Sequence, residues 1–184
     1  MGRYVAFLRA INVGGHTVKM EILRHHFADL GLRDVVTYIA SGNVSFATRA
    51  TDARALERRI ERRLEDELGF EVATFVRTDR EVAAVAAHQP FTPAQIAEAK
   101  SVNIAFLAES LGRDLQARVL SLQTSFDDFH FHGRELYWLS RRRQGESTIS
   151  NVALERAIGG RSTVRGVATV QRIATALASP TGAE

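Results

Sequence analysis

The residues with the clearest chemical potential lie in a glycine-containing loop, residues 11–19, between an apolar run and a helical pattern. Its backbone N–H groups and the positive end of the following helix could bind an anion. The spacing differs from a P-loop because no Gly-Lys-Ser/Thr follows, and a tight strand-to-helix connection also explains the glycines. The candidate ligand-binding residues around this loop are Arg9, Asn12, Gly14, Gly15 and Lys19.

A second basic cluster, Arg141-Arg142-Arg143, precedes a predicted helix start at Ser147. Arginine binds phosphate and carboxylate groups through two parallel hydrogen bonds. Arginines beside a helix N-terminus are therefore a second candidate anion site, although a solvated basic loop would have the same sequence. The candidate residues here are Arg141, Arg143 and Ser147, with Arg165 as a further contributor.

The tripeptide Ser41-Gly42-Asn43 could present a hydroxyl and an amide to a ligand. A hairpin turn explains all three residues as well, because glycine and asparagine both adopt positive φ. Ser41 lacks the histidine and acid that would activate it as a nucleophile. These three residues are retained as candidate ligand contacts.

The histidines do not form a convincing metal site. His130 and His132 are two apart on a predicted strand, so they point to one face, and two histidines alone do not complete a zinc site. Phe129 and Phe131 take the other face as predicted core, which leaves both histidines facing solvent. We therefore predict no metal and no cofactor. The adjacent histidines at 25 and 26 are predicted to be surface residues.

Hydrophobic periodicity predicts the order β-α-β-β-α-β followed by a helix, and then the same order again. The predicted strands cover residues 4–8, 35–39, 44–47, 72–77, 102–108, 126–131, 135–139 and 162–164. The predicted helices cover residues 20–30, 52–68, 79–88, 94–98, 111–122, 147–158 and 167–177. In the helix 52–68, alternating arginines and glutamates are expected to form a solvated face.

This order indicates an α+β fold of two ferredoxin-like (βαββαβ) halves packed together, each followed by an extra helix. The Pro-containing segment Gln89-Pro90-Phe91-Thr92-Pro93 is the best linker candidate. The predicted organisation is an N-terminal half at 1–89, a linker at 90–100, a C-terminal half at 101–179 and a tail at 180–184.

Composition narrows the class of protein. The 184 residues include no cysteine, so disulfides, thiolate metal sites and cysteine nucleophiles are excluded. No secretory signal and no membrane-spanning apolar run is recognised, so we expect a cytoplasmic protein without a membrane partner. The net charge of +3 comes mostly from arginine, which suits an anionic partner or a mildly basic surface.

Several stretches resemble the bacterial "domain of unknown function 1697" family: YVAFLRAINVGG, TYIASGNVSF, SRRRQGESTISNVALERAIGG and RSTVRGVATVQRI. The resemblance covers nearly the whole chain and implies an α+β fold of ferredoxin-like halves, but it carries no activity. Two departures matter. Ala10 stands where members usually have glycine, and Gly166-Val167 stand where they usually have Asn-Trp.

A βαββαβ sheet with aromatic residues is also typical of RNA-recognition modules, so this class is also considered. The signature run that those modules carry on their third strand is missing, because NVSFAT is short and lacks a basic start. Phe7 and Phe46 are therefore predicted to be core residues.

The sequence favours an anion-binding module, with a small anionic ligand or nucleic acid as the partner. One alternative is an enzyme acting on a small phosphorylated or carboxylated substrate, positioned by Asn12, Ser41 and Asn43. For that reaction only His16 and Glu21 stand near enough in sequence to act as a base. Another alternative is a structural or oligomerisation domain. Whether the protein is an enzyme, and its oligomeric state, stay open.

Overall fold

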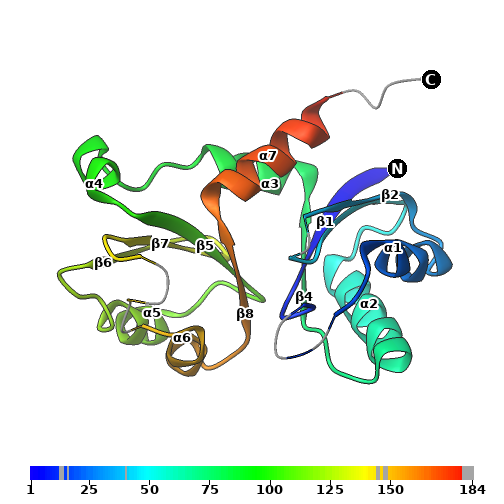
Figure 1. The fold of residues 1–184 in the computed structure, drawn as a ribbon, viewed down its shortest axis with the longest axis horizontal. Helices are drawn as coiled ribbons and strands as arrows, with labels where there is room; N and C mark the ends of the chain where they lie inside the picture. Colours follow the sequence, from blue (N-terminus) through cyan, green and yellow to red (C-terminus); the bar gives the residue numbers. More distant parts are fainter. Residues whose placement is uncertain (13–14, 16, 40, 144–145, 147–148, 180–184) are drawn as a thin grey trace. The chain divides into compact units, whose positions relative to one another are not determined.

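Strands and helices follow one another in the same order in the two halves of the chain (Figure 1). The computed structural model describes residues 1–12, 15, 17–39, 41–143, 146 and 149–179. The first half contains β1 (Gly2–Leu8), α1 (Met20–Asp29), β2 (Arg33–Tyr38), β3 (Asn43–Thr48), α2 (Ala53–Leu68), β4 (Thr74–Thr78) and α3 (Asp79–Ala87). The rest of the chain contains α4 (Pro93–Glu98), β5 (Ser101–Leu107), α5 (Arg113–Leu120), β6 (Asp127–His132), β7 (Glu135–Ser140), α6 (Asn151–Ile158), β8 (Ser162–Gly166) and α7 (Val167–Ala178).

The strands form two four-stranded sheets with the orders β2-β3-β1-β4 and β6-β7-β5-β8. All neighbouring strands are antiparallel. In each sheet the third strand of the half lies between the first and the second, which is the split βαβ arrangement. The predicted α+β fold with two ferredoxin-like halves is confirmed.

Local chemistry sets several element boundaries where the sequence predicts them. Asp52 caps α2 by accepting a hydrogen bond from the Ala55 N–H at 3.0 Å, and Gly69 ends the helix with φ 75°. The hairpin between β6 and β7 turns at residues 133–134, because His132 pairs with Glu135. Helix α6, predicted from Ser147, begins instead at Asn151.

The start of α6 is fixed by Ser150, whose hydroxyl accepts a hydrogen bond from the Ala153 N–H at 3.1 Å. Ser147 itself lies outside the described residues, as does the predicted tail at 180–184. Residues 90–100, predicted as a linker, contain α4, which starts with a capping box of Thr92 and Gln95.

Two predictions about side-chain exposure are corrected. His26 is buried rather than on the surface, because α1 packs Leu23, His26 and Phe27 inward as one face. Phe131 is only partly buried, whereas Phe129 on the same strand is in the core.

Each sheet packs one face against its own pair of helices. In the first half, Ala6, Leu8 and Val44 pack with residues of α1 and α2, including Phe27 and Ile60. In the second half, alternate residues of β5 and β7 pack with residues of α5 and α6. Figure 1 shows these two helices on one side of the second sheet. The core residues of this second cluster include Ala105, Leu107, Leu136, Val119 and Leu154.

The chain divides into two compact units, Met1–Ala84 with the described residues from Arg172, and Val85–Gln171. Helix α7 therefore contributes to both units. Within the first unit, the Arg3 guanidinium donates a hydrogen bond to the Leu177 carbonyl oxygen at 2.8 Å. The site described next lies wholly within the second unit.

Candidate functional site

A polar pocket of about 540 Å³ lies on the helix-packed face of the second sheet. Its floor is built from alternate residues of the neighbouring strands β7, β5 and β8, whose side chains point to one face. The strand register pairs Asn103 with both Trp138 and Gly166, so Asn103 occupies the middle of the floor. The floor residues are Ser101, Asn103, Trp138, Ser140, Val164 and Gly166.

The rim of the pocket combines the segment after β7 with the start of α6. It consists of Arg142, Arg143, Ile149, Ser150 and Asn151. The Arg142 guanidinium lies over the Phe126 ring, with Cζ at 3.8 Å from the ring centroid. A cation over an aromatic face is held in place without losing its charge. Arg142 is therefore half-buried and positioned, whereas Arg143 is exposed.

Backbone contacts hold this arginine segment against the end of the sheet. The Arg142 N–H donates to the Ser140 hydroxyl at 3.3 Å, and the Arg143 N–H donates to a Glu146 carboxylate oxygen at 3.2 Å. The Arg142 side chain also donates to the Glu146 carbonyl oxygen at 3.4 Å. These contacts hold Arg142 and Arg143 beside the end of β7, at the rim of the pocket.

The charged side chains in the lining of the pocket are basic. Two arginines line it, and none of the lining residues, all within the described chain, is acidic. The first turn of α6 adds the positive end of a helix dipole, and Ser150 and Asn151 contribute a hydroxyl and an amide. The arrangement can hold an anionic group at the rim and hydrogen-bond a polar ligand along the floor.

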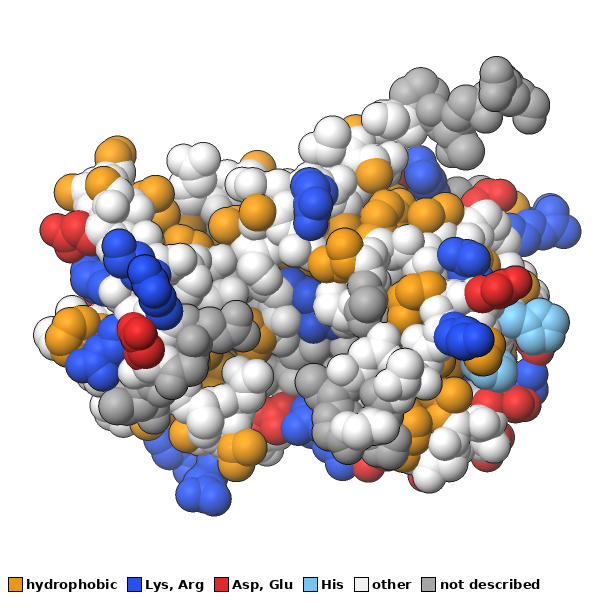
Figure 2. Space-filling model, in the orientation of Figure 1, with side chains coloured by type: hydrophobic (Ala, Val, Ile, Leu, Met, Phe, Trp, Pro, Cys, Tyr) orange, Lys and Arg blue, Asp and Glu red, His pale blue; other side chains and the backbone are white. Residues whose placement is uncertain are grey.

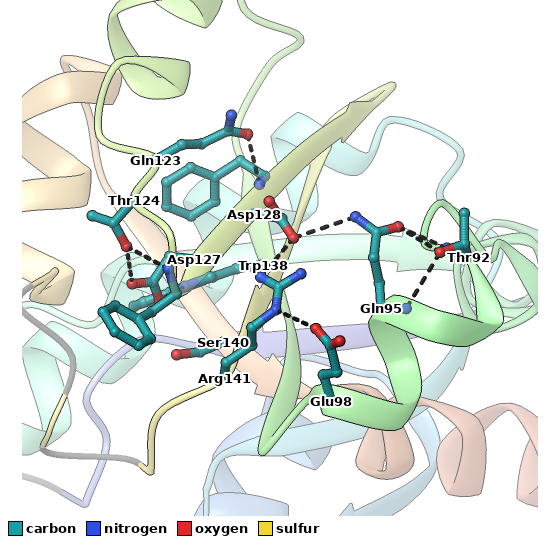
Figure 3. A network of polar contacts seen from close by, with 12 residues as sticks. Thr92, Gln95, Glu98, Gln123, Thr124, Asp127, Asp128, Trp138, Ser140 and Arg141 are labelled. Atoms are coloured by element: carbon teal, nitrogen blue, oxygen red, sulfur yellow. Dashed lines mark hydrogen bonds and ion pairs between the residues drawn. The ribbon is translucent and has the colours of Figure 1, made fainter.

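Arg141, predicted as a ligand contact, makes two ion pairs (Figure 3). Its Nε lies 3.1 Å from a Glu98 carboxylate oxygen, and its Nη1 lies 2.9 Å from a carboxylate oxygen of Asp128. The hydrogen bond to Glu98, followed by that to Asp128, raises the pKa of Arg141. Asp128 also accepts from the Gln95 amide, so Arg141 ties α4 to β6.

Arg165 lies on the opposite face of the sheet from Arg142 and Arg143. It is buried between Val164 and Gly166, the two β8 residues that line the pocket. Its Nη1 donates to the Thr163 hydroxyl and to the Val164 carbonyl oxygen, both at 2.8 Å. Burial lowers the pKa of Arg165 to about 10.

The first predicted anion loop, residues 11–19, belongs to the first compact unit, whereas the pocket belongs to the second. The Asn12 side-chain oxygen accepts from the Val18 N–H at 2.6 Å, which folds it into its own loop. Lys19 is the exposed N-cap residue of α1 and gives no side-chain cap bond. The Arg9 N–H bonds the Ala73 carbonyl oxygen at 2.8 Å, and Gly15 has φ 90°. Gly14 and His16 lie outside the described residues.

The tripeptide Ser41-Gly42-Asn43 builds the turn between β2 and β3. The Asn43 amide, fully buried, donates to the Tyr38 carbonyl oxygen at 3.0 Å and to the Ser41 hydroxyl at 2.9 Å. Gly42 has φ 74°, and a Cβ atom there would lie 2.5 Å from Cγ2 of Ile11. Turn geometry and close packing thus account for the three residue types.

The sequence did not single out Asn103, Ser101 or Ser140 as candidate site residues. Arg142 was named only as part of the cluster of residues 141–143. One signal was available. Along β5, the residues of one face change from Ser101 and Asn103 to Ala105 and Leu107. A polar start to an otherwise apolar strand face marks a place where the sheet extends beyond its covering helices.

The fold and the pocket define an α+β protein of two ferredoxin-like halves, the second of which carries an arginine-lined polar pocket. A family model described as "Protein of unknown function (DUF1697)" matches residues 1–137. The chain belongs to this family. The match ends before Arg142, Arg143 and Gly166, so family membership rests on residues other than these three.

Among solved structures, the chain is similar to the conserved bacterial protein SP0830 from Streptococcus pneumoniae. The two are 23% identical, with a TM-score of 0.79 over 97% of this chain and 99% of that one, which shows a shared fold. No curated protein matches the sequence. Among the helices that the structure describes, none has both the length and the apolar character needed to cross a membrane.

The two departures from the family pattern have structural counterparts. Ala10 has φ 56°, in the left-handed region that favours the glycine expected there. Gly166, at the position where asparagine is expected, lines the polar pocket.

Proposed function

We propose that the second half of this protein binds a small anionic ligand through Arg142 and Arg143, with a phosphate or carboxylate group at the rim. The observation that supports this function is the pairing of two arginines with an uncharged polar floor. A carboxylate lining would repel such a ligand, and the described lining has none. Arginine forks match the geometry of phosphate and carboxylate oxygens.

The same lining favours binding over catalysis. It contains serine, asparagine, arginine, tryptophan and apolar residues, but among the described residues no histidine, carboxylate, lysine or tyrosine that could move a proton. The earlier candidate bases, His16 and Glu21, belong to the first half of the chain. A ligand held at this pocket would therefore be recognised and positioned without a protein acid–base pair.

The test uses the only tryptophan of the chain, Trp138, as the reporter, because it forms part of the pocket floor. Fluorescence titration with pyrophosphate and with citrate should give saturable changes. Arg142→Gln and Arg143→Gln should each weaken binding at least roughly tenfold, since a hydrogen bond to a charged group contributes about 1.5–3 kcal/mol.

The matched control is Arg58→Gln, which removes an exposed arginine of α2 far from the pocket in sequence. This variant should bind both anions as the natural protein does. Equal affinity in Arg142→Gln, Arg143→Gln and Arg58→Gln would contradict the proposed site. Circular dichroism of each variant would show whether a loss reflects unfolding.

A further inference from the structure

The opposite face of the second sheet carries a second cavity, of about 390 Å³. It uses the strand residues next to those of the polar pocket: Val102 follows Ser101, and Tyr137 precedes Trp138. The remaining walls come from residues 88–96 and from Val167 and Gln171 of α7. Every lining residue belongs to the unit Val85–Gln171. We refer to this space as the apolar cavity.

The lining of the apolar cavity is mainly hydrophobic and carries no charged side chain among the described residues. Its polar groups are His88, Gln89 and Gln171. Its apolar and aromatic residues are Pro90, Phe91, Pro93, Ile96, Val102, Tyr137 and Val167. Small-molecule sites typically have this character: an apolar cavity of roughly 300–1,000 Å³ with few polar groups that orient the ligand.

His88 is the polar group with unmet hydrogen-bonding capacity. Its Nε2 is buried and has no hydrogen-bond partner among the described residues. The ring stacks on His132, with centroids 4.1 Å apart, and lies 5.0 Å from the Tyr137 ring centroid. With almost no accessible surface, this nitrogen lies out of reach of a ligand in the cavity, so His88 contributes its ring to the wall rather than a hydrogen bond.

His88 and Tyr137, the titratable groups in the lining of the cavity, are both uncharged at neutral pH. Burial, and then the nearby His132 and His130, lower the pKa of His88, so its imidazole is uncharged at pH 7. The Tyr137 hydroxyl donates to the Val85 carbonyl oxygen at 2.9 Å, and burial raises the pKa of Tyr137. A charged ligand would lose its hydration here, and no lining residue of the described chain carries an opposite charge.

The histidines around His88 do not gather as metal ligands. Stacked imidazole rings present their faces, rather than their nitrogen lone pairs, to each other. The described residues contain no group of three or more histidines and carboxylates placed to hold a metal ion. An organic ligand therefore fits the cavity better than a metal ion.

We propose that the apolar cavity binds a small, uncharged, ring-sized organic molecule, which packs against its apolar and aromatic walls. This site differs from the anion pocket in face, lining and ligand charge. Its existence does not depend on the proposed function above.

The test compares benzyl alcohol with benzoate, which are similar in size but differ in charge. Methyl chemical shifts of Ile96, Val102 and Val167 report on the apolar cavity, whereas Val164 reports on the anion pocket, which benzoate could also enter. Benzyl alcohol at millimolar concentration should shift the first three methyl signals. Benzoate should affect them at least roughly tenfold more weakly, because of its desolvation.

Two exposed isoleucines on helices provide a matched pair of variants. Ile96 lines the cavity and is 48% exposed, whereas Ile22 on α1 is 45% exposed and does not. Ile96→Trp should obstruct the cavity and weaken benzyl alcohol binding at least roughly fivefold, whereas Ile22→Trp should leave it unchanged.

Three results would overturn the proposal: no shift of the three methyl groups, an equal response to benzoate, or unchanged binding in Ile96→Trp. Arg142→Gln should leave benzyl alcohol binding intact, so failure of one site is distinguishable from failure of the other.

Discussion

Three consecutive arginines have different surroundings in this protein. Arg141 pairs with Glu98 and Asp128, Arg142 lies over the Phe126 ring, and Arg143 extends exposed at the pocket rim. The first therefore supports the structure, and the other two are available for a ligand. The basic cluster is visible in the sequence, but the partners of Arg141 come from α4 and β6, which no local pattern places beside it.

His88 should make stability depend on pH. Because its pKa is lowered in the folded protein, the unfolded chain binds a proton more readily in the window just below pH 6.5. The free energy of unfolding should therefore be undiminished above this window and fall as the pH decreases through it. Urea unfolding followed by circular dichroism between pH 7.5 and pH 5, as working values around the histidine pKa of about 6.5, would measure this decline.

The comparison variant is His88→Gln, which cannot be protonated in this range. Its stability should decline less steeply with acidification than that of the natural protein. The exposed Val152 of α6 provides the control, because Val152→Gln changes no titratable group and should leave the slope unchanged. Identical slopes for His88→Gln and the natural protein would show that His88 takes up its proton freely in the folded state.

At the scale of elements, glutamates on the helices accept hydrogen bonds from backbone N–H groups of the edge strands. Glu57 and Glu61 of α2 accept hydrogen bonds from the Val76 and Thr74 N–H groups of β4, at 2.8 and 2.9 Å. β4 is an edge strand, whose outward N–H groups would otherwise lack partners. The helix face that the sequence predicts as solvated is therefore partly buried, with Glu57 only 4% exposed.

The turn between β2 and β3 requires glycine at position 42 for two reasons, a positive φ and a lack of space for a Cβ atom. Comparison with Gly31, to which only the first reason applies, separates the two effects. Gly42 has φ 74° and lacks space for a Cβ atom, whereas Gly31 has φ 73° with nothing within 4 Å. Gly31→Ala should cost about 1 kcal/mol through backbone strain alone. Gly42→Ala should cost roughly 1–3 kcal/mol more, because its methyl group overlaps Ile11.

Chemical denaturation of both variants measures the two free energies of unfolding. Equal losses for Gly31→Ala and Gly42→Ala would mean that Ile11 moves aside at no cost, and would contradict the tight packing of the turn.

Element order was predictable from the sequence because periodicity, caps and turn residues are local signals, as Asp52, Gly69 and the turn at 133–134 show. The polar pocket was not predictable, because it depends on strand register. Asn103 becomes part of a site only when Trp138 and Gly166 are paired beside it. These residues are far apart in sequence, and no local pattern links them.

At the scale of the whole molecule, the two halves repeat one register with different side chains. Tyr4 pairs with Phe46 and Thr78, in the same positions in which Asn103 pairs with Trp138 and Gly166. The buried Tyr4 ring stacks on Phe46, with centroids 5.9 Å apart. Tyr4 thus holds in the first half the strand position that Asn103 holds in the second, and Thr78 holds the position of Gly166.

This correspondence predicts that Asn103→Tyr closes the polar pocket. The new ring should pack beside Trp138 as Tyr4 packs beside Phe46, and pyrophosphate affinity should fall at least roughly tenfold while Arg142 and Arg143 remain. Fluorescence titration measures this loss. Val36→Tyr, which adds a tyrosine at an exposed position of β2, should bind normally. Retained affinity in Asn103→Tyr would place the anion elsewhere.

The charge distribution of the whole molecule predicts how it should respond to nucleic acid. The net charge is only +3, and on the face shown in Figure 2 arginine and lysine side chains are interspersed with acidic and neutral ones. Single-stranded RNA should therefore gain its phosphate contacts mainly from the two arginines of the polar pocket. Two contacts correspond to a slope of about −1.4 in log affinity against log salt concentration.

Fluorescence anisotropy with labelled single-stranded RNA across several salt concentrations measures this slope. We expect weak binding with a shallow salt dependence, and Arg142→Gln should weaken it together with pyrophosphate binding and reduce the slope to about −0.7. A slope several times steeper, or one unchanged in Arg142→Gln, would require a wider basic surface than the pocket. The ligand would then be a nucleic acid spread over the protein, because a small anion contacts too few arginines to release that many counterions.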